Sequence, residues 1–134
     1  MNNDCLPCSL AMVLDMSVYD VKQAFPLHNT LRNDGTARGT HIQEVISWLR
    51  PKGYAVTVVE DRAFFEDGTE VESQSDRFDQ MINSTKGILI GINIRGNVHA
   101  CANIHGSIYD PARKGGSKHT IEKFFQYWII DPIK

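Results

Sequence analysis

Apolar residues in the first part of the chain recur at helical spacing. Over residues 5–16 they return at steps of three and four, which is the pattern of a buried helix. A second, shorter helix over 17–25 begins at a serine cap and ends before a proline. A third, over 40–51, opens with a capping box in which Thr40 pairs with Gln43. The pattern therefore predicts three helices before any strand.

Beyond residue 53 the pattern changes to that of strands. β-branched and apolar runs, bounded by turn residues, predict strands at residues 54–59, 87–94, 98–104, 107–109 and 128–130.

Between these strands we expect a hairpin turn at Asp67-Gly68, a helix over 75–83, a basic glycine-rich loop over 111–118 and a helix over 120–127. Helices come first and antiparallel strands follow, with neither a repeat nor a low-complexity linker. The order predicts the α+β class. We expect residues 1–134 to form one domain.

Composition and charge narrow the classes of function. Of the 134 residues, 42% are hydrophobic, which is enough for one core. The net charge of −2 comes from 16 acidic and 14 basic side chains spread along the chain, so no nucleic-acid partner is expected. No apolar run reaches the roughly 18–20 residues of a membrane span. The N-terminus also lacks the features of a secretory signal, so we expect a cytoplasmic protein.

Three cysteines are the chemically notable residues. Their odd number favours reduced thiols over a disulfide framework. Cys5 and Cys8 have the spacing of a redox pair, and the two together with His99 and Cys101 could also bind zinc, although neither pattern is specific. For Cys8 and Cys101 we favour the role of small buried hydrophobic residues, Cys8 on the inward stripe of its helix.

Cys5 differs because it lies at the N-terminus of the first predicted helix. The helix dipole at that position favours a thiolate, and a histidine elsewhere could supply the base. His99 is the candidate base because it opens a predicted strand, whereas His28, His41 and His119 lie beside helix ends or loops.

Asp110 is the candidate partner of His99. If Ile104 and His105 form a two-residue hairpin turn, residues 99 and 110 lie directly opposite each other, and the carboxylate can orient the imidazole. A turn shifted by one residue would instead place Asp110 opposite Cys101 or a neighbour, and contact with His99 would then need a bulge. An ordinary turn at the end of a strand is the alternative explanation for Asp110-Pro111.

Taken in order and spacing, several segments together resemble the double-glycine leader peptidases and their stand-alone relatives, which are compact papain-like cysteine peptidases. The resemblance covers residues 3 to 112 and rests on Asp4-Cys5, the helix Cys8-Ser9-Leu10-Ala11-Met12-Val13-Leu14, Ser17-Val18-Tyr19-Asp20-Val21, Gly39-Thr40, Leu49-Arg50-Pro51-Lys52-Gly53-Tyr54, Gly87-Ile88-Leu89-Ile90, Asn97-Val98-His99-Ala100 and Tyr109-Asp110-Pro111.

The resemblance implies a helical lobe that carries the cysteine, packed on an antiparallel sheet that carries the histidine and the aspartate. Cys5 then matches the nucleophile, His99 the general base and acid, and Asp110 the orienting carboxylate. The reaction would be hydrolysis of a peptide or related amide through a thioester, with a peptide or protein as substrate. Neither a cofactor nor a metal ion is expected.

Two positions depart from the family pattern. Leu6 stands where the family usually has glycine after the nucleophile. The family also places a glutamine about six residues before the cysteine to complete the oxyanion hole; here Asn2 or Asn3 is expected to supply that amide. Loss of such a donor costs about 10²–10³ in rate, so a catalytically silent module that binds a peptide is the alternative function.

Overall fold

A computed structural model describes residues 5–26, 28, 33–34, 39–60, 80–93, 98–111 and 121–133 of the chain. Its first half is helical, as the sequence predicts. The elements are α1 (Cys5–Leu14), α2 (Val18–Gln23), α3 (Ile42–Leu49) and the short 3-10 helix η1 (Arg50–Lys52). Residues 80–84 are also helical, in agreement with the end of the helix predicted over 75–83. The turn predicted at Asp67-Gly68 lies outside the described residues.

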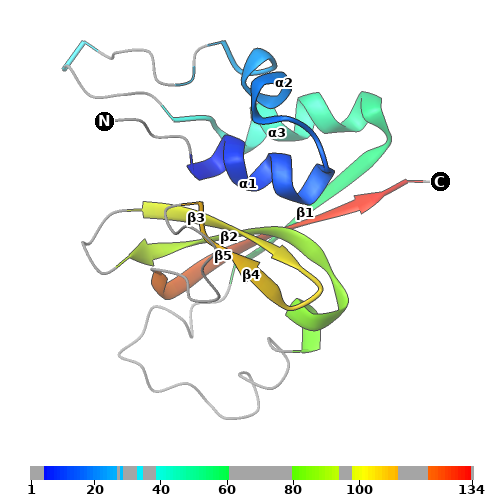
Figure 1. Ribbon diagram of the computed structural model, residues 1–134, viewed down its shortest axis with the longest axis vertical. Helices are drawn as coiled ribbons and strands as arrows, with labels where there is room; N and C mark the ends of the chain where they lie inside the picture. Colours follow the sequence, from blue (N-terminus) through cyan, green and yellow to red (C-terminus); the bar gives the residue numbers. More distant parts are fainter. Residues whose placement is uncertain are drawn as a thin grey trace.

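The second half forms one antiparallel sheet. Its strands are β1 (Tyr54–Glu60), β2 (Lys86–Asn93), β3 (Val98–Ile104), β4 (Ser107–Tyr109) and β5 (Ile121–Pro132), in the spatial order β1-β5-β2-β3-β4. The three helices lie together on one side of the sheet (Figure 1). The predicted α+β class is therefore confirmed, with Cys5 on an N-terminal helix and His99 on the sheet.

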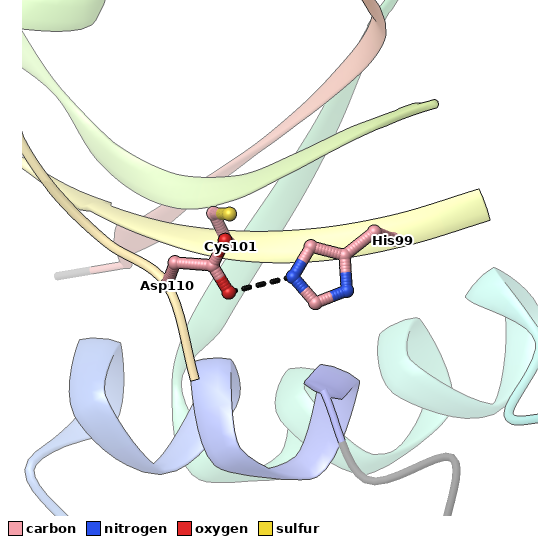
Figure 2. Close-up of side chains that lie close together, drawn as sticks. All are labelled: His99, Cys101 and Asp110. Carbon is pink, nitrogen blue, oxygen red and sulfur yellow. Dashed lines mark hydrogen bonds and ion pairs between the residues drawn. The ribbon is translucent and has the colours of Figure 1, made fainter. Parts of the chain in front are cut away.

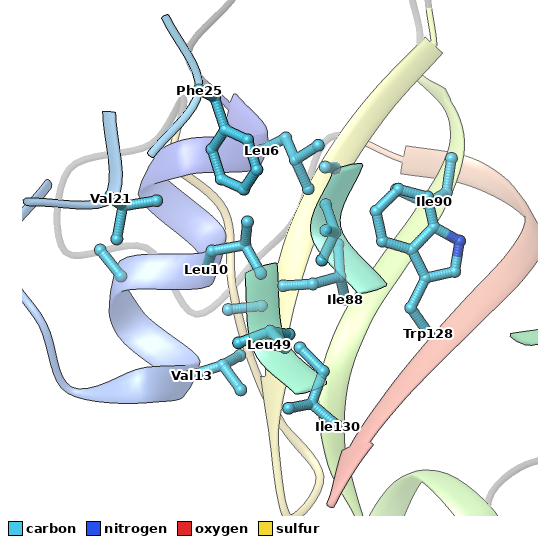
Figure 3. Packing of buried hydrophobic residues seen from close by; sticks show 14 residues of the cluster. Leu6, Leu10, Val13, Val21, Phe25, Leu49, Ile88, Ile90, Trp128 and Ile130 are labelled. Atoms are coloured by element: carbon cyan, nitrogen blue, oxygen red, sulfur yellow. The ribbon is translucent and has the colours of Figure 1, made fainter. Parts of the chain in front are cut away.

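The main core fills the space between the helices and the sheet (Figure 3). The helices contribute apolar side chains that are 7% exposed or less, among them Leu6, Leu10, Val13, Val21, Phe25, Val45 and Leu49. The sheet contributes Ile88, Ile90, Ala100, Ala102, Trp128 and Ile130. Because α1 packs directly on β3 and β2, this core fixes the position of the first helix relative to the histidine strand.

The helix predicted over 120–127 is wrong, because residues 121–127 belong to β5. This strand lies in the middle of the sheet and pairs with both β1 and β2. Tyr127 is buried in a second cluster with Leu89, while its neighbour Trp128 is buried in the main core. Apolar contacts on both sides and hydrogen bonds along both edges outweigh the helical propensity of the segment.

The cap of α3 lies one residue later than predicted. Its N-cap is His41, whose backbone N–H donates to the Glu44 carboxylate at 2.7 Å. Thr40 does not serve as the cap, because its hydroxyl shares a 2.7 Å hydrogen bond with Nδ1 of His28. The cap of α2 is as predicted, since the Ser17 hydroxyl accepts from the backbone N–H of Asp20 at 3.1 Å.

Candidate active site

Cys5 is the first residue of α1 and is half-buried. The start of a helix leaves backbone N–H groups unpaired, and their partial positive charge favours an anion there. Leu6, the next residue, is buried in the main core, and Ser9 donates a 3.3 Å hydrogen bond to the carbonyl of Ala100 on β3. α1 therefore packs on the strand that carries His99 and is joined to it by this hydrogen bond.

His99 is the second residue of β3 and is 9% exposed. Its partner across the β2–β3 ladder is Gly91, which has no side chain to crowd the imidazole. The register between β2 and β5 also shifts at Ile90/Gly91, next to this position. Such bulges are frequent beside functional sites because they change the direction in which side chains point.

Asp110 contacts His99, but not in the register that the sequence analysis favoured. The hairpin turn is His105-Gly106, with φ of 50° and 94°, and Ile104 pairs with Ser107. Asp110 therefore follows the last β4 residue at the level of Cys101 and reaches His99 diagonally, a distance that longer side chains can span. Its Oδ1 accepts a 2.6 Å hydrogen bond from Nε2 of His99 (Figure 2).

The imidazole of His99 has several polar neighbours. Hydrogen bonding to the side chains of Cys101 and Cys5, together with the hydrogen bond and charge of Asp110, outweighs desolvation and raises the pKa of His99 from 6.5 to about 11. His99 thus stays protonated at neutral pH, and Asp110, which is 3% exposed, is its counter-ion. Nδ1 points away from the Asp110 carboxylate (Figure 2).

The other two cysteines behave differently from each other. Cys101 is completely buried, as predicted, and burial raises the pKa of its thiol. Its side chain interacts with that of His99, two residues earlier on β3; the sequence analysis considered these two residues together as members of a zinc set. Cys8 was expected on the inward stripe of α1, but it is half-buried and lines a shallow pocket beside Met12 and Pro111.

A cleft of about 230 Å³ lies between Cys5 and His99. It is small compared with the roughly 300–1,000 Å³ of pockets for drug-sized ligands, and it suits a short stretch of an extended chain. Most of the exposed surface of its lining is apolar, contributed by Leu6, Ile90, Val98, Ala100 and Trp128.

Two cleft residues were not recognised as site residues from the sequence. His28 and Thr40 line the cleft and are joined by their 2.7 Å hydrogen bond, although we assigned a surface or capping role to each. They are 12 positions apart in the sequence, so their proximity leaves no periodic signal. Asn2 and Asn3, expected in the oxyanion hole, lie outside the described residues.

The structure does not bring together the zinc ligands that the sequence analysis considered for the cysteines, and the redox pair is not joined. None of the three cysteines forms a disulfide bond. Within the described residues, the potential metal ligands that lie close together are His99, Cys101 and Asp110, without Cys5 or Cys8. The four-residue zinc set considered from the sequence is therefore not formed.

The pH dependence of stability should reflect the proton on His99. Because the folded pKa is above the unfolded value of 6.5, its contribution is fully present below pH 6.5 and is lost as the pH rises toward 11. Cys5→Ala loses one of the hydrogen bonds that raise the pKa of His99 but keeps those to Cys101 and Asp110, so we expect its unfolding free energy still to fall with pH above 6.5, by at most about 1.4 kcal/mol per pH unit. The Cys5→Ala variant is used so that the thiol of Cys5 does not titrate. The buffer contains EDTA to remove metal ions and a reductant to keep the remaining thiols reduced.

The matched control is the Cys5→Ala/His99→Gln double variant, measured by urea unfolding at the same pH values. Both proteins keep Asp110, Cys101 and His28, so the difference in slope reports on His99 together with its coupling to Cys101. Identical slopes would show that His99 gains no proton affinity on folding.

Comparison with models of known protein families and with curated proteins gives no match. None of the helices in the described part of the chain has the length and apolar character needed to cross a membrane.

Proposed function

We propose that the protein is a cysteine hydrolase with a papain-like arrangement, which cleaves a peptide or related amide bond. The observation that carries the proposal is the buried 2.6 Å hydrogen bond between His99 and Asp110, on an imidazole that also interacts with Cys5 beside an open cleft. A nucleophile, a base and a group that orients the base are the parts that covalent acyl transfer requires. The resemblance of the sequence motifs supports the same assignment.

In this mechanism Asp110 holds Nε2–H, so that Nδ1 of His99 is the nitrogen that exchanges a proton with Cys5. The thiolate attacks the amide carbonyl carbon, and the electron pair of the C=O bond moves to oxygen. His99 then donates its Nδ1 proton to the leaving amine as the C–N bond breaks. Water, deprotonated by His99, hydrolyses the thioester and returns the thiol.

The oxyanion would be stabilised by the backbone N–H groups at the start of α1. Cys5 is the first residue of this helix, so its N–H lies at the positive end of the helix dipole. We propose Asn2 or Asn3 as the second donor. The small apolar cleft favours an extended peptide segment as substrate.

Thiol reactivity provides a test that needs no substrate. We expect iodoacetamide at pH 6 to modify Cys5 faster than Cys8, and His99→Ala to slow the modification of Cys5 by roughly tenfold or more. Cys8 is an internal control, because it lies one turn later on the same helix and is also half-buried. Peptide mass spectrometry distinguishes the two sites.

His105→Asn is the matched control variant. His105 lies in the β3–β4 turn with φ of 50°, a conformation that asparagine tolerates. It should leave the labelling of Cys5 unchanged. If Cys5 and Cys8 react alike and His99→Ala changes neither, the hydrolase proposal fails and a peptide-binding module becomes the better assignment.

A further inference from the structure

His99, Cys101 and Asp110 form a group with one more polar side chain than acyl transfer requires. Their nitrogen, sulfur and oxygen atoms all lie within 4.8 Å of one another, and all three residues are buried. His99 and Cys101 are alternate residues of β3, and Asp110 follows β4 at the same level of the sheet. The proposed mechanism uses His99 and Asp110 and leaves the thiol of Cys101 without a role.

We propose that these three side chains bind a zinc ion, through Nε2 of His99, the Cys101 sulfur and the Asp110 carboxylate. Zinc accepts nitrogen, sulfur and oxygen ligands at about 2.0–2.3 Å, so atoms around a tetrahedral ion lie roughly 3.2–3.8 Å apart. The observed limit of 4.8 Å lies above this range and the 2.6 Å contact between Nε2 and Oδ1 below it. Only small side-chain movements are needed.

The total charge of the three side chains and the types of their ligand atoms favour zinc. A divalent ion with one thiolate, one carboxylate and a neutral imidazole is electrically neutral, which lowers the cost of holding it in a buried site. The sulfur and nitrogen ligands disfavour magnesium and calcium, which prefer oxygen. The ligands are 9%, 0% and 3% exposed, so a substrate could not reach the ion, and a catalytic zinc is not implied.

If the proposed hydrolase function is correct, the bound zinc would inhibit it. Zinc binding itself does not depend on that function. With zinc on Nε2 in place of the Asp110 hydrogen bond, the remaining ring proton lies on Nδ1. The imidazole then cannot accept the proton of Cys5. Zinc would thus inhibit catalysis by binding the general base, His99, and would not need to bind the nucleophile, Cys5.

Cobalt(II) titration of the full chain tests the binding, because a cobalt–thiolate bond gives a charge-transfer absorption band. We expect the band in the parent protein, in Cys5→Ala and in Cys8→Ala. Cys101→Val, which suits a buried strand, should lose it and bind zinc about 100-fold or more weakly in competition with a chelating indicator. Cys101→Ser is a second variant, and circular dichroism verifies that each one folds.

Loss of the band in Cys5→Ala, or its survival in both Cys101 variants, would overturn the proposed site, as would the absence of saturable binding by the parent. A second measurement follows the alkylation of Cys5 with and without zinc. Zinc should slow it in the parent and change it less than about twofold in Cys101→Val, each compared with its own metal-free rate. If the protein proves not to be a hydrolase, the cobalt result still decides whether the site exists.

Discussion

Replacement of Cys5 by alanine is expected to lower the hydrolysis of peptide amides by about 10⁴-fold or more, to the level of the buffer alone. Alanine removes the sulfur that forms the thioester. The fold should remain intact, because Cys5 is half-buried at the first position of α1. The measurement is fluorophore release from a library of fluorogenic peptide amides, with the parent protein assayed in parallel.

Cys8→Ala is the matched control for Cys5→Ala, since it removes a thiol of similar burial from the same helix. It should keep activity within about twofold of the parent, as expected for a site outside the reacting atoms. Equal activity of Cys5→Ala and the parent would refute the role of Cys5 as nucleophile. Loss of activity in both variants, with changed circular dichroism, would indicate damage to α1 instead.

Two substitutions of Asp110 distinguish whether this residue acts by orienting the His99 ring or by its negative charge. We expect Asp110→Ala to lower kcat/KM by about 10²–10⁴-fold, because Nε2 of His99 loses its 2.6 Å partner and the ring can rotate or change tautomer. Asp110→Asn should lose less, because its amide oxygen can still accept from Nε2–H. The rates are measured with the best substrate of the peptide library.

Asp131→Asn is the control for these variants, because it changes the same kind of side chain at an exposed position of β5. Thermal denaturation of all three proteins shows whether a loss of rate reflects unfolding. Full activity in a folded Asp110→Ala protein would rule out an orienting role. Equal losses in Asp110→Ala and Asp110→Asn would show that the negative charge, and not the orientation, is what the site needs.

The sequence predicted α1, α2 and α3 and the strands β1 to β4 because each has a local pattern. Spacing of apolar residues, caps and turn residues are properties of short segments and do not depend on the rest of the chain. The same reasoning found residues 128–130 of β5 but failed for its first part, residues 121–127, because this strand has apolar residues on both sides. Without a period of two, such a strand is not distinguishable from a buried helix.

The candidate site was predicted in part. Cys5 at a helix start and His99 at a strand start follow from local patterns, and the structure brings them to one cleft. The position of Asp110 depended on which residues form the hairpin turn, and a change of one residue alters every pair across it. The positive φ of Gly106 is the physical reason that the turn is His105-Gly106. Cys101 lies two residues after His99 on β3, so the predicted strand already places the two side chains on one face, whatever the hairpin register.

The place of β5 in the sheet also affects how the protein is made. β5 joins β1 to β2, yet it follows every other strand in the sequence. On the ribosome, β1 and β2 therefore emerge before the strand that unites them. At about 5–20 residues per second, roughly 10 s separates the appearance of Cys5 from that of the completed sheet. During synthesis the thiol of Cys5 is therefore present before the complete sheet, and with it the proposed active site, can form.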